Sequence, residues 1–236
     1  MKQFAVFDID GTLIRWQLYH AVVDKLAKQG HLGGDAHDKL HDARMVWKER
    51  TDDDAFARYE TLLVETFESA LPSLDPAVFD TLVDTVIGEY KNQVYTYTRD
   101  LVASLKQQGY FLLAISGSHH ELVAKLAAYY GFDDFVGTHY TRNGHQFSGD
   151  VYIPSLDKQS ALQTLIKKHN LSTTGSIAVG DTKSDIALLE SVEKPIAFNP
   201  EKQLYTHARA HGWPIVVERK NVIYTLGSHD TQYVLD

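Results

Sequence analysis

Residues 1–12, MKQFAVFDIDGT, decide the fold, because a short apolar run ends there abruptly in two aspartates. The run Lys2 to Phe7 predicts a buried strand. Asp8 and Asp10 alternate with Ile9, so in extended backbone their side chains point the same way. At the carboxyl end of a parallel strand they would face the crevice where open α/β sheets bind ligands. Two close carboxylates repel each other unless a cation lies between them, and Mg²⁺ prefers oxygen ligands.

The same acids also suit a turn, and Asp-x-Asp-Gly begins an EF-hand loop. An EF-hand is excluded because an apolar strand precedes the acids and no Glu closes a loop at the required distance. The turn remains an alternative for Asp8 and Asp10 when they are considered alone.

Beyond residue 95, short apolar runs alternate with helical patterns, which predicts a doubly wound, Rossmann-like α/β fold with a mostly parallel sheet. A hairpin turning at Asn143-Gly144 interrupts the alternation over residues 138–153. The tail after Val217 gives no readable pattern. Strands are expected near 110–115, 135–136, 176–180, 195–198 and 214–217, and helices near 99–108, 119–130, 156–168, 183–190 and 201–211.

The segment from Arg15 to Tyr95 reads as consecutive amphipathic helices without a strand. Breaks are expected at Gly33-Gly34, at 52–54 and at 72–76. We therefore predict two domains: an α/β core over 1–15 and 96–236, and an inserted all-helical cap over 16–95.

Three further groups stand at predicted strand or helix ends. Asp181 follows the run SIAVG, and Asp185 lies four residues on, one helical turn away. Ser116 and Gly117 precede a predicted helix, whose N-terminus favours anions. Lys158 lies in the first turn of a helix, where a cation is unfavourable unless an anion compensates. Taken singly, Asp181 or Ser116 could simply cap a helix, and Lys158 could be a solvated surface lysine. These explanations do not account for the ordered set of all of them.

The composition limits the remaining classes of function. The net charge is −8, which disfavours sequence-independent binding to nucleic acid or to anionic membranes. There is no cysteine, so disulfides and thiolate metal sites are excluded. The twelve histidines lack H-E-x-x-H spacing, and they give no basis for expecting a histidine metal site. Neither a signal peptide nor a spanning segment is recognised, so a cytoplasmic protein is expected. The sequence does not determine the oligomeric state, and a monomer is consistent with it.

This ordered set resembles the haloacid dehalogenase-type (HAD) phosphatase superfamily. FDIDGT is similar to its first motif, AISGS to its second, Lys158 to its third and GDTKSD to its fourth. The helical insertion between the first two motifs resembles the cap of the phosphoserine-phosphatase-like branch (subfamily IB). The resemblance implies a Mg²⁺-dependent phosphatase that acts on a small phosphorylated metabolite.

The resemblance also implies roles for individual residues. Asp8 would be the nucleophile that forms an aspartyl-phosphate, and Asp10 the general acid and base. Mg²⁺ would be held by Asp8, the Asp10 carbonyl and Asp181, with Asp185 as an outer-shell or direct ligand. The phosphate ligands would be Ser116, the Gly117 amide and Lys158, with Thr12 supporting the loop.

Some positions depart from the phosphoserine phosphatases. Gln17 stands where those enzymes carry a substrate-binding Glu, so the resemblance does not imply phosphoserine as the substrate. Candidate substrate contacts on the cap side are Arg15, Gln17, Tyr19, His20 and Arg58. A phosphotransferase or phosphomutase using the same intermediate is an alternative, and a phospho-ligand-binding protein without turnover is another.

Overall fold

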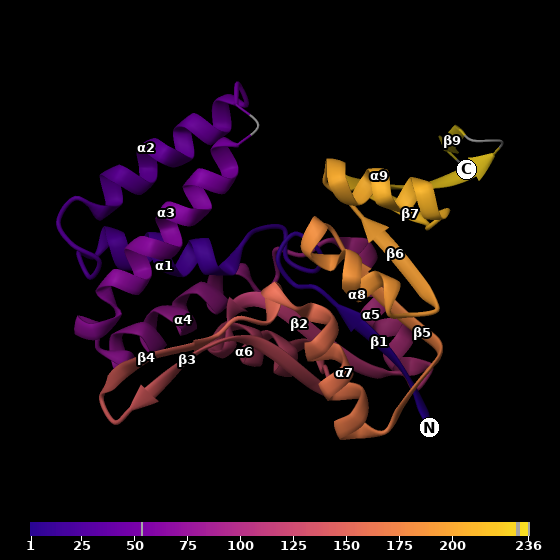
Figure 1. The fold of residues 1–236 in the computed structure, drawn as a ribbon, viewed down its shortest axis with the longest axis horizontal. Helices are drawn as coiled ribbons and strands as arrows, with labels where there is room; N and C mark the ends of the chain where they lie inside the picture. Colours follow the sequence, from indigo (N-terminus) through magenta and orange to yellow (C-terminus); the bar gives the residue numbers. More distant parts are fainter. Residues whose placement is uncertain (53, 230–231, 236) are drawn as a thin grey trace. The chain divides into compact units, whose positions relative to one another are not determined.

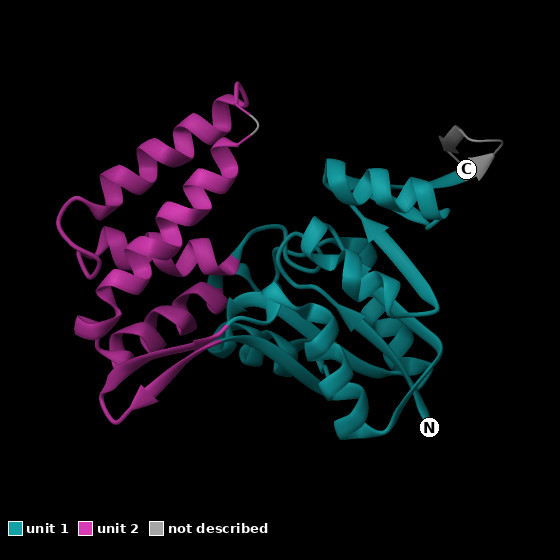
Figure 2. Cartoon of the chain, in the orientation of Figure 1, with its two compact units in different colours: residues 1–17, 89–138, 153–236 teal, residues 18–88, 139–152 magenta. Residues whose placement is uncertain are grey.

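The computed structural model describes residues 1–52, 54–229 and 232–235, and these form two compact units. Unit 1 contains residues 1–17, 89–138 and 153–236, and unit 2 contains residues 18–88 and 139–152 (Figure 2). Of the break predicted at 52–54, residue 53 lies outside the described residues. No helix among the described residues is long and apolar enough to span a membrane.

A mostly parallel sheet organises unit 1, as the sequence predicted. Its strand order is β3-β2-β1-β5-β6-β7-β8-β9, so the first strand of the chain lies between β2 and β5 (Figure 1). The pairs from β3 to β7 in this order are parallel, and β8 and β9 continue the sheet antiparallel. The strands are β1 (Lys2–Phe7), β2 (Phe111–His119), β3 (Asp134–Asn143), β5 (Leu171–Gly180), β6 (Lys194–Phe198), β7 (Ile215–Arg219), β8 (Val222–His229) and β9 (Gln232–Leu235).

Both faces of this sheet are covered, which explains why its strands are apolar runs without a polar face. One face packs Val6 and Ala178 into a core with Leu162, Leu188 and other buried side chains of the helices that follow β4, β5 and β6. On the opposite face Phe7 packs edge to face against Phe132, with ring centroids 5.9 Å apart. The helices of unit 1 are α5 (Thr96–Gln107), α6 (His120–Tyr130), α7 (Lys158–His169), α8 (Ile186–Glu190) and α9 (Lys202–His211).

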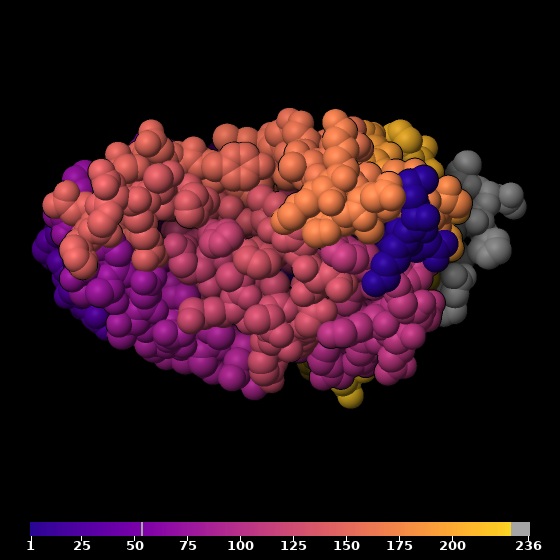
Figure 3. Space-filling view, turned by 90° about the horizontal axis from the view of Figure 1, so that it is seen from below, coloured from indigo at the N-terminus to yellow at the C-terminus, as the bar shows by residue number. Residues whose placement is uncertain are grey.

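The start of the chain lies at the surface of unit 1. Met1 is 85% exposed, and Lys2 pairs with Leu171 at the opening of β5. In Figure 3 these first residues, in indigo at the right, lie on the surface against the orange segment.

Unit 2 is helical, with one hairpin added from later in the chain. Its helices are α1 (Leu18–Lys28), α2 (Ala36–Glu49), α3 (Ala55–Ala70) and α4 (Pro76–Tyr90), the last of which continues into unit 1. The hairpin joins the end of β3 to β4 (Gln146–Tyr152), and its aromatic side chains pack into the helices. Phe147 lies 5.8 Å from Phe79, and Tyr140 lies 5.3 Å from Phe67, between ring centroids.

The boundaries differ from the predicted domains, because residues 16–17 and 89–95, predicted in the cap, belong to unit 1, and because one hairpin changes unit. The prediction assigned all of 96–236 to the core, whereas the hairpin 139–152 groups with the helices. The cause is the aromatic packing of its inward face, which the local pattern of a hairpin does not reveal. The hairpin also turns at Gly144-His145 instead of Asn143-Gly144, because Asn143 already pairs with Gln146.

Candidate active site

The predicted functional side chains of the core come from the carboxyl ends of neighbouring strands. Asp8 follows β1, and its N–H donates to the Val179 carbonyl of β5 at 3.0 Å. Asp181 follows β5 directly, and Ser116 lies in the last part of β2. Because β1 lies between β2 and β5, the three strand ends meet at one edge of the sheet.

Lys158 connects two of the acids. Its Nζ donates to Asp8 Oδ1 and to Asp185 Oδ1, both at 2.6 Å. All three residues are buried, with exposed fractions of 3% for Lys158, 5% for Asp8 and 0% for Asp185. The lysine is the first residue of α7, whose N-cap Asp157 accepts from the Ser160 N–H at 2.9 Å. The unfavourable helix position of Lys158 is therefore compensated by two carboxylates.

Asp185 is held on both of its carboxylate oxygens. Oδ1 accepts from Lys158, while Oδ2 accepts from the Asp181 and Thr182 N–H groups at 3.1 and 3.0 Å. The short 3₁₀ turn Lys183–Asp185 brings it back under the end of β5. This bonding suits a residue that positions Lys158 and the Asp181 backbone. Of the two predicted roles for Asp185, it favours the outer-shell role over direct ligation of the metal.

The loop after Asp8 brings Gly11 and Thr12 against Asp181. Gly11 has φ of +84°, and a Cβ at this position would lie 2.2 Å from Asp181 Oδ2. Thr12 donates from Oγ1 to Asp181 Oδ1 at 2.9 Å. Gly180 is constrained in the same way, since its Cβ would lie 2.5 Å from the Asp185 side chain. These glycines are functional positions that we did not predict, although their place beside the acids was a usable signal.

Asp10 and Ser116 form the neighbouring part of the site. Ser116 donates from Oγ to Asp10 Oδ2 at 2.8 Å, and its Oγ accepts from the Ser118 N–H at 3.0 Å. Strand β2 continues to His119, so Ser116 and Gly117 do not directly precede α6 as the sequence suggested. A side chain at Gly117 would come within 3.1 Å of Ser155 Oγ, which keeps this backbone accessible only as glycine.

The buried acids of the site carry more negative charge than Lys158 alone can neutralise. The pKa of Asp8 is raised to about 7, chiefly by burial, which Lys158 opposes and to which Asp185 and Asp10 contribute. Burial, Asp8 and Asp185 raise the pKa of Asp181 well above its ordinary value. Single carboxylate oxygens of Asp8, Asp181 and Asp185 lie within 4.8 Å of one another. Because one lysine faces three acids here, the donor set fits a hard divalent cation.

Arg15 and Gln17 lie in unit 1, close to where the chain passes into unit 2. The Arg15 guanidinium forms an ion pair with Glu218 and donates from Nε to the Val94 carbonyl at 2.6 Å. Glu218 also accepts from the Tyr97 N–H at the start of α5, at 2.8 Å. These contacts give Arg15 a structural role, and Glu218 is a partner that no pattern in the sequence indicated.

The other predicted cap-side residues lie in unit 2. Tyr19 packs against Phe67 at 5.9 Å, and His20 is 3% exposed with its ring 5.2 Å from that of Tyr59. Arg58 is exposed and forms an ion pair with Asp52. Core packing accounts for Tyr19 and His20, and their contact with a substrate stays a prediction.

Comparison with known proteins agrees with these features. The model of the haloacid dehalogenase-like hydrolase family matches residues 5–190, which include Asp8, Asp10, Asp181 and Asp185. The chain is 25% identical over 227 residues to a histidinol-phosphatase of Neisseria meningitidis, covering 92% of this chain and 99% of that protein. It is 25% identical over 206 residues to a phosphoserine phosphatase of Archaeoglobus fulgidus, covering 86% of this chain but 54% of the relative.

The fold recurs among solved structures. A Bordetella pertussis protein of unknown function superposes with a TM-score of 0.71 at 21% identity, covering 91% of this chain and 98% of that one. At this identity the likeness concerns the fold alone.

Proposed function

Because the chain belongs to the haloacid dehalogenase-like hydrolase family, we propose that it is a Mg²⁺-dependent phosphatase that acts through an aspartyl-phosphate on Asp8. The observation that supports this most is the position of Lys158, which donates to both Asp8 and Asp185 in a buried site. A phosphoryl group arriving there would meet a carboxylate nucleophile beside a fixed positive charge.

In the first step, an Asp8 carboxylate oxygen attacks phosphorus, and the bond from phosphorus to the leaving-group oxygen breaks. Asp10, in its protonated form, gives its proton to the departing alkoxide, so the alcohol leaves neutral. The Ser116 hydroxyl, 2.8 Å from Asp10 Oδ2, orients that carboxyl group. Lys158 and the Gly117 N–H hold the phosphoryl oxygens.

In the second step, the Asp10 carboxylate takes a proton from water, and the hydroxide attacks phosphorus. The bond between phosphorus and the Asp8 oxygen breaks, which releases phosphate and restores the Asp8 carboxylate. Asp8, Asp181 and the Asp10 carbonyl would hold Mg²⁺, with Asp185 outside the direct ligands. When bound, the metal supplies charge neutralisation between the acids and the phosphoryl group.

The substrate is a small phosphomonoester. The relative that matches over almost its entire length is named a histidinol-phosphatase, so histidinol phosphate is the first metabolite to test. Phosphoserine is the second, although Gln17 replaces a carboxylate that would pair with its amino group. The helical unit would serve as a cap that supplies specificity, with Tyr19, His20 and Arg58 as its candidate contacts and Arg15 and Gln17 as candidate contacts from unit 1.

The test is phosphate release from an aryl phosphate and from both metabolites, with Mg²⁺ or EDTA, for the wild type and Asp8→Asn. Asn is nearly isosteric with Asp but cannot form the intermediate. We expect Mg²⁺-dependent turnover that the substitution abolishes, and rapid-quench trapping of one acid-stable phosphoryl group per chain. Lys183→Met, which changes an exposed side chain between Asp181 and Asp185, is the control and should retain full activity.

Two outcomes would contradict the proposal. Turnover that survives in Asp8→Asn would remove Asp8 as the nucleophile. Phosphate transfer to an added alcohol that exceeds phosphate release would favour the phosphotransferase. Binding of phosphorylated metabolites without release of phosphate would instead favour a binding protein.

A further inference from the structure

Three potential metal ligands lie together away from the candidate active site. Glu190 ends α8, and His207 and His211 lie on α9. One ligand atom from each residue falls within 4.8 Å of the other two. The cluster is at the end of α8 opposite Asp185, so it is separate from the acids that serve phosphoryl transfer.

The two imidazoles are arranged as a pair. A spacing of four residues places them on one face of α9, where their rings stack with centroids 4.0 Å apart and an interplanar angle of 17°. His211 Nδ1 lies 2.9 Å from the His207 carbonyl oxygen. A carbonyl only accepts, so Nδ1 of His211 carries the proton and Nε2 presents its lone pair. A proton on the non-ligating nitrogen, donated to a backbone carbonyl, is typical of histidines that bind metals.

Glu190 supplies the third donor. His207 Nε2 is buried and lies 3.0 Å from Glu190 Oε1 but forms no hydrogen bond among the described residues, so this nitrogen faces the carboxylate where a cation could stand. An ion pair between the helices would account for His207 and Glu190 alone. It does not require a second imidazole with a nitrogen within 4.8 Å of both groups, which is why we favour a metal site.

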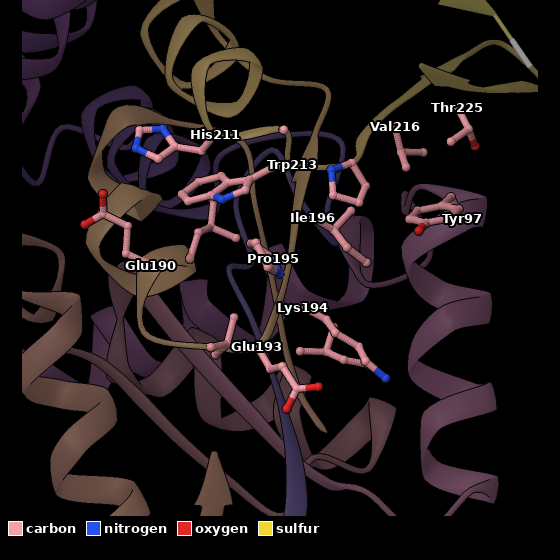
Figure 4. A pocket seen from close by; sticks show the side chains of 15 residues that line it. Tyr97, Glu190, Glu193, Lys194, Pro195, Ile196, His211, Trp213, Val216 and Thr225 are labelled. Atoms are coloured by element: carbon pink, nitrogen blue, oxygen red, sulfur yellow. The ribbon is translucent and has the colours of Figure 1, made fainter. Parts of the chain in front are cut away.

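Trp213 restricts the movement of both rings. Its indole lies 4.9 Å from the His207 ring and 5.6 Å from the His211 ring. Figure 4 shows Glu190 and His211 on the same side of the Trp213 indole, at the edge of a cavity of about 750 Å³ with an apolar wall that includes Pro195. Ligands held in place by packing lose little conformational freedom when they bind.

We propose that Glu190, His207 and His211 form a second metal site, selective for a borderline divalent transition ion such as Zn²⁺. Two imidazole nitrogens and one carboxylate oxygen are ligands of such ions, whereas Mg²⁺ and Ca²⁺ prefer oxygen alone.

The metal would connect α8 to α9 at the ends remote from the acids. At the near ends, the Glu201 N–H before α9 donates to the Asp181 carbonyl at 2.9 Å. Glu201 Oε1 also accepts from the Lys183 N–H, at 2.6 Å. A bound ion would therefore join α8 and α9 at their other ends. We expect it to stiffen the segment that carries the fourth motif, GDTKSD.

The test is Zn²⁺ binding to the full chain without a histidine tag, after treatment with chelator and in excess Mg²⁺ to supply the acid cluster. Calorimetry should show one Zn²⁺ per chain. Binding should weaken by at least about tenfold in Glu190→Gln, His207→Gln and His211→Gln, because each removes a ligand. Co²⁺ should give visible absorption bands that the same substitutions abolish.

The chain offers a matched control on α2. His37 and His41 are also four residues apart, with ring centroids 6.4 Å apart, but they join no group of three ligands among the described residues. The double variant His37→Gln/His41→Gln should bind Zn²⁺ as the wild type does. His211 is exposed, so His211→Gln remains decisive if His207→Gln proves unstable. Unchanged binding in His211→Gln, loss of binding in the α2 variant, or complete displacement of Zn²⁺ by Mg²⁺ would overturn the proposal.

Discussion

Replacing Lys158 by Met tests the electrostatics of the site most directly. Lys158 is 3% exposed and donates to Asp8 and Asp185 at 2.6 Å each. Although burial opposes its charge, the two acids raise the pKa of Lys158 above the ordinary value. Removing one partner of a buried ion pair costs about 3–5 kcal/mol, because the remaining charge is left uncompensated. We expect a loss of this size in the free energy of unfolding in EDTA at pH 8.

Two conditions separate this electrostatic cost from lost packing. Burial already raises the pKa of Asp8 to about 7, and Lys158 opposes that rise, so the variant should raise the pKa further. A carboxyl whose folded pKa is raised destabilises the protein as pH increases, and the loss should therefore shrink toward pH 5. Mg²⁺ should recover at least about 1.4 kcal/mol, a factor of ten in the equilibrium constant, by replacing the missing positive charge.

The assay is urea unfolding followed by far-UV circular dichroism and tryptophan fluorescence, in EDTA and in Mg²⁺. Lys183→Met makes the same replacement at an exposed lysine and should change the unfolding free energy by no more than about 0.5 kcal/mol. A loss below about 1 kcal/mol for Lys158→Met in EDTA, or a loss independent of Mg²⁺ and pH, would refute the reasoning.

Three other perturbations follow from described contacts. Gly11→Ala should weaken Mg²⁺ activation by at least about tenfold, because its Cβ would collide with Asp181 Oδ2; the measurement is the Mg²⁺ concentration for half-maximal turnover. Burial lowers the pKa of His20 to about 4, so the unfolded chain takes up a proton between about pH 6.5 and 4 that the folded one excludes. Lowering the pH from 7.5 to 5 should then cost the wild type about 2 kcal/mol more unfolding free energy than His20→Gln. Glu218→Ala should destabilise unit 1 by about 3 kcal/mol in urea unfolding, since it leaves Arg15 and the start of α5 without their acceptor.

Each of these has its own contradicting result. Unchanged activation by Mg²⁺ in Gly11→Ala would show that the loop yields without moving Asp181. Equal losses of stability on acidification in the wild type and His20→Gln would mean that His20 is not held neutral. A change below about 0.5 kcal/mol in Glu218→Ala would show that water or another group replaces the carboxylate.

Local signals in the sequence predicted the core of the fold and the members of the site. The strand Lys2–Phe7 was predicted with its observed bounds, because its apolar run is closed on both sides by polar residues. Lys158 was recognised because a cation at the start of a helix needs a compensating anion. In the structure that anion is provided twice, by Asp8 and Asp185.

Partners distant in the chain could not be predicted in this way. Arg15 and Glu218 are 203 residues apart, and neither belongs to a pattern that indicates the other. The hairpin was recognised, but Phe147 gave no sign that it packs on Phe79 in the helical unit. The bond from Lys158 to Asp185 likewise joins residues 27 positions apart, and it emerges only when α7 is placed beside the segment that follows β5.

The central position of β1 has a consequence for synthesis of the chain. This strand is synthesised well before its neighbours β2 and β5, which begin at Phe111 and Leu171. At about 5–20 residues per second, the second neighbour follows on the order of ten to thirty seconds later. During that interval an apolar segment with unsatisfied main-chain groups is exposed to other nascent chains. A holdase chaperone that covers such segments should therefore improve the yield of folded protein.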